Sequence, residues 1–303
     1  YRKTNFFTTS AFSNCIFWIK KLMLMNWLNI FRFLRPKTKP FSAWQIELTT
    51  RCPLSCRMCI RDEAEDWFSS DMSIENFRKL TPYFKDVQTV ILEGWGESLL
   101  HRNLIEIIRL VKAEGSQVGF VTSGRVLNKE YISEIISTGI DFIGFSLSGA
   151  TPVTHDSIRI NSDLKSLIGY IQTFNEIRRE KKIERPKLHI VYLMLKDNIS
   201  EVPALLKLVK EIGIEEVVLT NLIHVANEWQ EGQRVFRCIP LTHPSPLRGE
   251  GEGEGYEEIL NEAEAKAKEL NISLRRPSLS PIEVSVCEEN PLRNLYISVD
   301  GEV

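Results

Sequence analysis

The chain has 303 residues, enough for one large domain or two ordinary ones. Its formal net charge is -2, from 38 Lys and Arg against 40 Asp and Glu, so it lacks the basic bias of nucleic-acid-binding proteins and we expect no nucleic-acid partner. Six cysteines are too sparse for a disulfide scaffold, and three of them are so closely spaced that they suit a metal in a reducing, cytoplasmic environment.

Residues 1–43 form a basic and hydrophobic segment that begins with Tyr1 and mixes Leu, Ile, Phe, Trp and Met with Lys and Arg. Its uncharged run, residues 22–31, is about half as long as a membrane-spanning helix requires. We expect a short amphipathic helix packed on the outside of the main domain. Peripheral contact with a membrane surface is the alternative. We also expect the sequence to be truncated at this end.

From residue 44 onward, short runs rich in β-branched and aromatic residues alternate with longer amphipathic segments. The predicted strands are 44–50, 87–94, 117–123, 141–148, 187–195 and 215–221. The predicted helices are 73–84, 102–114, 128–138, 162–182 and 200–212, several of them after a Ser, Asp or Asn that can cap the first turn. This alternation predicts an α/β fold with parallel strands and right-handed crossovers. It leaves two architectures open, an open doubly wound sheet and a partial barrel.

The unusual sequences follow the carboxyl ends of the predicted strands. Three cysteines follow the first strand, "EGWGESLLH" (93–101) follows the second, and "TSG" (122–124) ends the third. The fourth strand leads into "SLSGATPVTHDSIR" (146–159), which contains Ser148 and His155. Because the carboxyl ends of parallel strands meet at one edge, these residues predict a pocket for a polar, carboxylate-bearing small molecule.

Cys52, Cys56 and Cys59 have no fourth partner nearby, because neither Cys nor His occurs between Cys59 and His101. Structural zinc takes four protein ligands, and three closely spaced thiolates are not a usual set for catalytic zinc. A four-iron four-sulfur cluster prefers thiolates, and three of them leave one iron free to bind a substrate or cofactor. The spacing therefore favours an open-iron cluster over zinc.

The Cys-x3-Cys-x2-Cys spacing directly after the first strand resembles the radical S-adenosylmethionine (radical SAM) superfamily. The resemblance covers roughly residues 44–221, with "GWGES" in place of the family's Gly-Gly-Glu-Pro stretch and "SLSG" in place of Ser-Leu-Asp-Gly. It implies a partial (β/α)6 TIM-like barrel with a parallel sheet. It also implies that Cys52, Cys56 and Cys59 hold a [4Fe-4S] cluster whose fourth iron is chelated by S-adenosylmethionine.

Carried over by position, the resemblance implies that Trp95, Gly96 and Glu97 receive the amino group of S-adenosylmethionine. Ser146 and Arg159 are the candidates for its carboxylate or ribose. The implied reaction is reductive cleavage of the cofactor to a 5'-deoxyadenosyl radical that abstracts hydrogen from a substrate, with electrons from a reductant such as ferredoxin or flavodoxin. That step needs no conventional acid or base.

The sequence departs from the family pattern in three features. Met58 replaces an aromatic residue before the last cysteine. Trp95 stands where the first glycine of Gly-Gly-Glu is common, and Ser98 replaces the proline that follows. Ser148 replaces the frequent Asp of the fourth strand end. Methionine can still pack over an adenine ring. We expect His101 and His155 to be hydrogen-bonding structural residues.

After residue 222 the sequence changes character. Residues 223–286 are predicted to be a connecting region with a low-complexity loop at 240–255, a helix at 256–270 and a strand at 272–276. Residues 287–303, "CEENPLRNLYISVDGEV", resemble the start of the extension called SPASM, in which a cysteine precedes a hairpin and further cysteines bind auxiliary iron-sulfur clusters.

The C-terminal resemblance implies that Cys287 is the first ligand of an auxiliary cluster and that the sequence is truncated in the SPASM region. A buried structural cysteine is the alternative. Cys238 is a weak second candidate.

Members with this extension modify peptides or protein side chains, whereas others act on small molecules in cofactor biosynthesis. We therefore expect a radical SAM enzyme acting on a peptide or protein side chain, with a small-molecule substrate as the first alternative. A non-catalytic metal or electron-transfer protein is the second. It would not need "GWGES", "TSG" and "SLSG" at successive strand ends.

Overall fold

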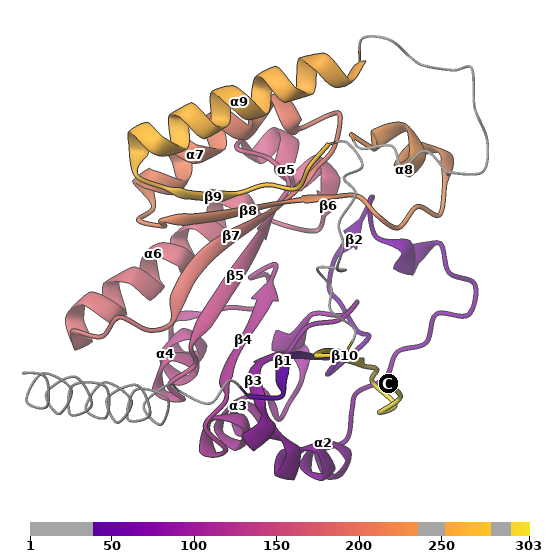
Figure 1. Cartoon of the computed structure of the whole chain (residues 1–303), viewed down its shortest axis with the longest axis vertical. Coiled ribbons are helices and arrows are strands. Elements are labelled where there is room, and N and C mark those ends of the chain that lie inside the picture. The colour runs from indigo at the N-terminus through magenta and orange to yellow at the C-terminus, as the bar shows by residue number, and fades with distance from the viewer. Residues whose placement is uncertain (1–38, 236–251, 280–291) are drawn as a thin grey trace, which may run out of the picture. The chain divides into compact units, whose positions relative to one another are not determined.

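A computed structural model describes residues 39–235, 252–279 and 292–303 (Figure 1). The chain divides into two compact units, Tyr1–Lys39 and Pro40–Val303, and nearly all the described residues belong to the second. Most of the predicted N-terminal segment lies outside the described residues, as do Cys238 and Cys287. No helix in the described ranges is long and apolar enough to cross a membrane.

The second unit is built on a curved, fully parallel sheet of eight strands in the order β10-β1-β3-β4-β5-β7-β8-β9. The strands are β1 (Phe41–Ile46), β3 (Val87–Ile91), β4 (Gln117–Thr122), β5 (Phe142–Leu147), β7 (Lys187–Met194), β8 (Glu216–Asn221), β9 (Ser273–Arg275) and β10 (Asn294–Ile297). The six predicted barrel strands lie side by side in chain order. In a doubly wound sheet, by contrast, the order of the strands reverses at a switch point. The prediction of a partial TIM-like barrel is therefore confirmed.

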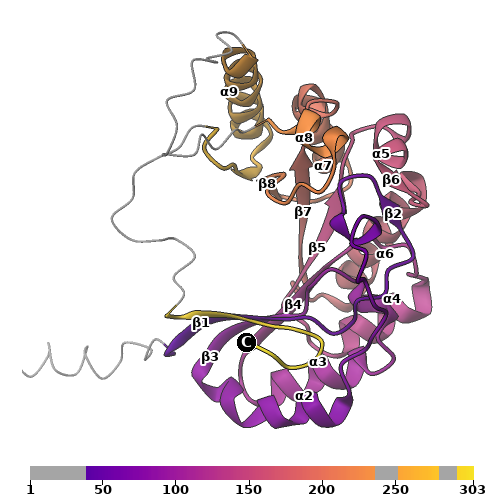
Figure 2. The same ribbon diagram turned by 90° about the vertical axis from the view of Figure 1, so that its right-hand side faces the viewer.

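Helices cover the outer face of this sheet (Figure 2). They are α2 (Ile74–Leu80), α3 (Leu104–Ala113), α4 (Lys129–Ser137), α6 (Leu164–Lys181) and α7 (Val202–Glu211), and α9 (Glu252–Leu270) packs against α7. The expected caps are present, since the side chains of Ser73, Asn128 and Asp163 accept hydrogen bonds from the first turns of α2, α4 and α6.

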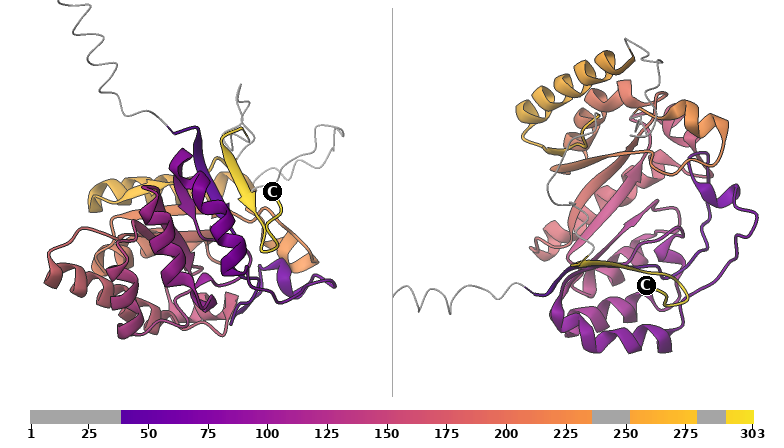
Figure 3. Two further views of the ribbon diagram at one scale, coloured as in Figure 1. Left: turned by 90° about the horizontal axis from the view of Figure 1, so that it is seen from below. Right: turned by 45° about the vertical axis from the view of Figure 1, so that its right-hand side comes forward.

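Shorter elements lie between the main strands and helices, and Figure 3 gives two further views of the ribbon. Those that follow the carboxyl ends of strands are β2 (Ser55–Cys56), η1 (Ile60–Asp62), η3 (Ser98–Leu100), α5 (Pro152–Ile158), β6 (Arg159–Ile160), η4 (Ile199–Glu201) and α8 (Glu228–Gln233). The 3-10 turn η2 (Thr81–Asp86) leads instead into the amino end of β3. The two-residue strands β2 and β6 pair antiparallel, which joins the cysteine loop to the segment after α5.

Alternation along the strands separates the core from the concave face. In β7, Leu188, Ile190, Tyr192 and Met194 are buried and belong to the main hydrophobic core, while the residues between them are less buried. Strand side chains alternate between faces, so the buried set points to the helices and the other set lines the inside of the curved sheet. The inner face is therefore the one available to a ligand.

The structure differs from the sequence prediction at several element ends. The predicted helix 73–84 is α2 followed by the 3-10 turn η2, because Pro82 has no N–H to continue the α-helical ladder. The first strand is 41–46 instead of 44–50, and residues after it turn into the cysteine loop. Helix α9 begins at Glu252, inside the predicted loop 240–255, where glutamates favour a helix N-terminus. Strand β10, from the predicted C-terminal extension, pairs with β1.

Candidate functional site

The cysteine loop follows β1 and is held in a curled shape by its own hydrogen bonds. Cys56 pairs with Arg159 across β2 and β6, and the Cys59 amide donates to the Cys56 carbonyl at 2.9 Å. The Arg61 guanidinium donates to the carbonyl oxygens of Cys52, at 3.2 Å, and of Leu54. These bonds bring the three cysteines to one side of the loop.

All three cysteines face one cavity of about 200 Å³ at the carboxyl ends of the strands. Its wall consists of Cys52, Leu54, Cys56, Met58, Cys59, Arg61, Glu93, Gly94, Trp95, Gly96, Glu97, Val121, Thr122, Ser123, Ser146 and Arg159. All the described residues that were predicted to bind the cluster or S-adenosylmethionine line this cavity, whereas Ser148 and His155, which were expected at the same edge of the sheet, do not. The wall of the cavity is therefore formed by residues at the carboxyl ends of β1, β3, β4 and β5 and by β6.

The three cysteines are free thiols on the wall of the cavity. Among the described residues, no three Cys, His, Asp or Glu side chains form a group that could hold a single metal ion. An iron-sulfur cube differs from a single ion because each thiolate binds a separate iron, so the three sulfurs stand apart. Three cysteines on one cavity wall are compatible with such a cluster.

Burial sets the protonation state of the cysteines. It raises the pKa of Cys52 to about 11, and it also raises the pKa of Cys56. Both thiols are therefore neutral in the protein alone at pH 7. Iron deprotonates a coordinating thiol outright, so loading a metal here releases protons.

The loop after β3 approaches the cysteine loop closely. A Cβ added to Gly96 would lie 2.1 Å from the carbonyl oxygen of Thr49, so only glycine fits at this position. The next amide, that of Glu97, donates to the carbonyl of Arg51 at 2.8 Å. Backbone contact thus fixes the two loops together.

The Glu97 side chain is 4% exposed and is saturated by protein donors. Its oxygens accept from the hydroxyls of Thr122 and Ser123, both at 2.7 Å, and from the Ser123 amide at 2.9 Å. A further bond comes from the Leu99 amide at 3.3 Å. The carboxylate therefore joins the ends of β3 and β4, a role that the motif resemblance did not reveal.

Arg159 is held by a buried network. Its Nε donates to Ser148 Oγ at 2.9 Å, while the Ser148 amide donates to His155 Nδ1 at 3.2 Å and the Ser148 carbonyl accepts from Asn198 at 3.1 Å. His155 Nε2 lies 3.0 Å from Ser162 Oγ. Burial, and next the charge of Arg159, lowers the pKa of His155 to about 3, so this ring stays neutral and acts as a structural acceptor.

Two further buried side chains have structural contacts. His101 contacts the Met72 carbonyl at 2.9 Å and accepts from the Asn103 amide at 3.2 Å. Gln230, on α8, donates to the carbonyls of Arg57 at 3.0 Å and Cys59 at 3.4 Å. Sequence reasoning missed Gln230, because its partners lie about 170 residues earlier and no local pattern marks it.

The mouth of the cavity is aromatic. Trp95, which is 36% exposed, makes edge contacts with Trp67 at 6.4 Å and with His224 at 5.4 Å between ring centroids. These three rings come from the loops after β3, β1 and β8. The guanidinium of Arg57 lies 3.9 Å from the ring centre of Trp229, which ties α8 to the cysteine loop.

Glu93 is a carboxyl group on the cavity wall without an assigned role in the sequence prediction. Burial, and next the charge of Glu97, raises its pKa to about 7. A carboxyl group with such a pKa exchanges protons near neutral pH. It adds one protonatable group to a site otherwise made of thiols, arginines and peptide groups.

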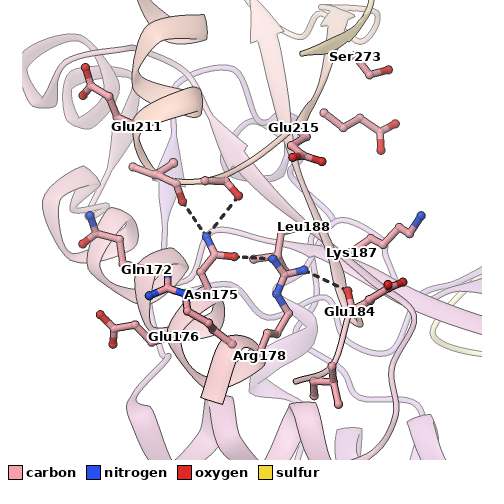
Figure 4. A pocket seen from close by; sticks show the side chains of 15 residues that line it. Gln172, Asn175, Glu176, Arg178, Glu184, Lys187, Leu188, Glu211, Glu215 and Ser273 are labelled. Atoms are coloured by element: carbon pink, nitrogen blue, oxygen red, sulfur yellow. Dashed lines mark hydrogen bonds between the residues drawn. The ribbon is translucent and has the colours of Figure 1, made fainter. Parts of the chain in front are cut away.

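A larger hollow of about 1000 Å³ lies at the opposite, amino-terminal ends of β7 and β8 (Figure 4). Asn175 lies in its wall, where it donates to the Ile212 carbonyl at 2.7 Å and accepts from Arg178 at 2.6 Å. Much of the remaining wall is charged surface side chains, including Glu176 and Glu211, without a cysteine. It belongs to the face of the barrel away from the predicted site.

The comparisons with known proteins agree with this geometry. The family model described as "Radical SAM superfamily" matches residues 46–209. A tungsten-containing aldehyde ferredoxin oxidoreductase cofactor-modifying protein of Pyrococcus furiosus is 25% identical over 187 residues, covering 60% of this chain and 52% of the relative. Pre-heme d1 synthase of Dinoroseobacter shibae is 26% identical over 247 residues, covering 78% and 58%. The chain thus spans little more than half the length of these relatives.

Among solved structures, Streptococcus suis SuiB bound to S-adenosylmethionine superposes with a TM-score of 0.62 at 13% identity, covering 86% of this chain and 59% of SuiB. SuiB has also been solved with its precursor peptide SuiA, and that structure superposes with a TM-score of 0.60 at 12% identity, covering 99% and 66%. At these identities the likeness establishes the fold alone.

Proposed function

Because the chain belongs to the radical SAM superfamily, we propose that its cavity binds a [4Fe-4S] cluster and S-adenosylmethionine and that the protein uses them for hydrogen abstraction from a substrate. The observation that carries this proposal is the convergence of three cysteines, the 93–97 loop and Arg159 on one cavity wall. When bound, the pair supplies a one-electron cleavage of the sulfonium that generates a hydrogen-abstracting radical.

In this proposal Cys52, Cys56 and Cys59 hold the cluster. Arg61 keeps the loop curled by binding the carbonyls of Cys52 and Leu54, so the three sulfurs stay on the cavity side. The Arg61 charge also lowers the pKa of Cys52, although burial outweighs it. Positive charge beside three thiolates offsets part of the cost of burying them.

The cofactor's polar groups find complementary partners on the facing wall. An amino group needs acceptors, and the peptide carbonyls of Trp95 and Gly96 supply them, because the Glu97 carboxylate is already saturated. Arg159, which lines the cavity, is the donor for the carboxylate or the ribose, and its Nε is fixed on Ser148. Ser146 adds a hydroxyl, and Met58 adds an apolar surface.

We propose a peptide or protein side chain as the substrate, with a small molecule of cofactor biosynthesis as the alternative. A peptide is supported by the likeness in fold to SuiB, which binds a precursor peptide. The alternative is supported by the two relatives above, a cofactor-modifying protein and a haem d1 precursor synthase. We further propose that Cys287 begins an auxiliary iron-sulfur site and that a ferredoxin or flavodoxin supplies the electrons.

Anaerobic reconstitution with iron and sulfide tests the cluster assignment. We expect about four irons per chain at this site, an absorbance band typical of a [4Fe-4S] cluster, and an electron paramagnetic resonance signal of the reduced cluster that changes when S-adenosylmethionine is added. Replacing Cys52, Cys56 or Cys59 by alanine should abolish that signal change. Cys15→Ser is the matched control, because it removes a cysteine to which neither the motifs nor the proposal gives a role.

Two results would contradict the proposal. One is a chain that takes up a single zinc and no iron cluster. The other is a wild-type cluster whose electron paramagnetic resonance signal does not change when S-adenosylmethionine is added.

A separate experiment distinguishes the two substrate classes, in which the loaded protein receives S-adenosylmethionine together with deuterated candidate peptides. Deuterium in the 5'-deoxyadenosine supports the peptide, and deuterium transfer from small molecules alone supports the alternative.

A further inference from the structure

Glu47 is a buried carboxylate to which neither the sequence motifs nor the proposed chemistry gives a role. It follows β1, is 4% exposed, and lies on the inner side of the sheet, since the flanking Ile46 and Leu48 pack into the main core. An unpaired carboxylate at such a position would be costly, so its partners are informative.

One oxygen of Glu47 holds the cofactor loop. Oε1 accepts from the Trp95 amide at 2.8 Å. Gly94 makes room for this contact, because a Cβ at that position would lie 2.4 Å from Glu47 Cγ and 2.5 Å from Oε1. The 94–97 loop, which lines the cavity, is thus also held from the β1 side by a charge-assisted hydrogen bond, in addition to the backbone bond between Glu97 and Arg51.

The other oxygen holds the C-terminal segment. Oε2 accepts from the buried Val299 amide at 3.4 Å, and the Glu47 amide donates to the Ile297 carbonyl at 2.9 Å. The Tyr296 side chain, on the strand paired with β1, also interacts with the Glu47 carboxylate. Burial, and next the Glu47 charge, raises the pKa of Tyr296 to about 12, so the phenol stays a donor at neutral pH.

We propose that Glu47 is a positioning residue that couples the C-terminal segment 294–299 to the loop 94–97, so that docking of β10 onto β1 orders the peptide groups that receive the amino group of S-adenosylmethionine. This inference rests on the proposed function for the identity of the ligand. The coupling itself rests on contacts within the chain. The coupling predicts that substitutions in segment 294–299 change the affinity for S-adenosylmethionine, and that they do so through the Glu47 carboxylate.

The test compares wild type with Glu47→Gln, Tyr296→Phe and the double variant in the full chain. Gln keeps the shape of Glu47 but replaces one acceptor oxygen by an NH2 group, so one of the two amide contacts is lost. In the cluster-loaded protein we expect Glu47→Gln to raise the Kd for S-adenosylmethionine about tenfold, which is about 1.4 kcal/mol. The maximal rate of cofactor cleavage at saturation should stay within about twofold.

Hydrogen exchange of the cluster-free chain gives a readout independent of activity. We expect faster exchange at the Trp95 amide in Glu47→Gln, and a smaller acceleration in Tyr296→Phe, whose ring is 41% exposed and whose substitution leaves the core intact. The double variant should exchange no faster than Glu47→Gln alone, because both changes act through the same carboxylate.

Glu216→Gln is the matched control, since Glu216 also joins two strands, binding Arg275 across β8 and β9 at the far edge of the sheet. It should leave Trp95 exchange and cofactor affinity unchanged. Unchanged Trp95 exchange in both Glu47→Gln and Tyr296→Phe, or additive effects in the double variant, would overturn the coupling. Failure of the wild type to bind S-adenosylmethionine refutes the proposed function instead, and leaves the exchange result to judge the coupling.

Discussion

The neutral His155 makes stability depend on pH in a way that can be calculated. The ring is fully buried, and its pKa falls from 6.5 to about 3, chiefly because burial disfavours the charged form. A depressed histidine pKa means that the unfolded chain binds the proton more readily than the folded one. Its contribution to stability is therefore complete above about pH 6.5 and is lost progressively as the pH falls towards 3.

The size of the effect follows from the two pKa values. Between pH 7 and pH 5.5 the unfolded chain takes up most of one proton at this histidine, whereas the folded chain takes up almost none. The free energy of unfolding should then fall by about 1 kcal/mol more in wild type than in His155→Gln over that interval. Titratable groups common to both proteins cancel in the comparison.

Urea unfolding of the cluster-free chain at the two pH values measures this difference. His224→Gln is the control, because it removes an imidazole from the exposed mouth of the cavity and leaves the Ser148 network intact. Identical pH dependence in wild type and His155→Gln would refute the reasoning, since it would mean that the buried ring takes up its proton as readily as it does in the unfolded chain.

Two further substitutions test the packing of the site by urea unfolding. Gly96→Ala should destabilise the chain by about 1–3 kcal/mol, because its Cβ would meet the Thr49 carbonyl, whereas Gly169→Ala, in α6 with open space around it, should stabilise the chain by about 0.5–1 kcal/mol. Equal effects of the two alanines would contradict the close approach at Gly96. Glu97→Gln should cost about 2–3 kcal/mol because it breaks charge-assisted hydrogen bonds, whereas Glu106→Gln, at an exposed ion pair, should cost under about 1 kcal/mol. A Glu97→Gln variant as stable as wild type would show that its donors find other partners.

The sequence predicted the barrel strands because each combines β-branched and aromatic residues with flanking turn residues. Strands β4, β5, β7 and β8 begin and end within about one residue of the expected positions, whereas β3 begins where expected and ends three residues early. Strand β10 was not expected in this sheet. Its pairing with β1 joins residues about 250 positions apart, and no periodicity within either segment encodes that contact.

The sequence predicted the part of the site that is made of residues in recognisable motifs. Cysteine spacing and strand-end position placed the thiols, Gly96 and Arg159 on one cavity, because parallel strands present their carboxyl ends together. The supporting residues were not predictable in the same way. Glu47 and Gln230 act through single hydrogen bonds to backbone groups remote in sequence, and such bonds leave no local pattern.

The central claim is that three cysteines and the facing loop form one site for a cluster and S-adenosylmethionine. Its most direct measurement is the amount of 5'-deoxyadenosine formed when the reconstituted protein is reduced with dithionite in the presence of S-adenosylmethionine. The account predicts product from wild type and none from Cys56→Ala, with Cys15→Ser behaving as wild type. A loaded cluster that forms no 5'-deoxyadenosine, or equal product from Cys56→Ala, would contradict it.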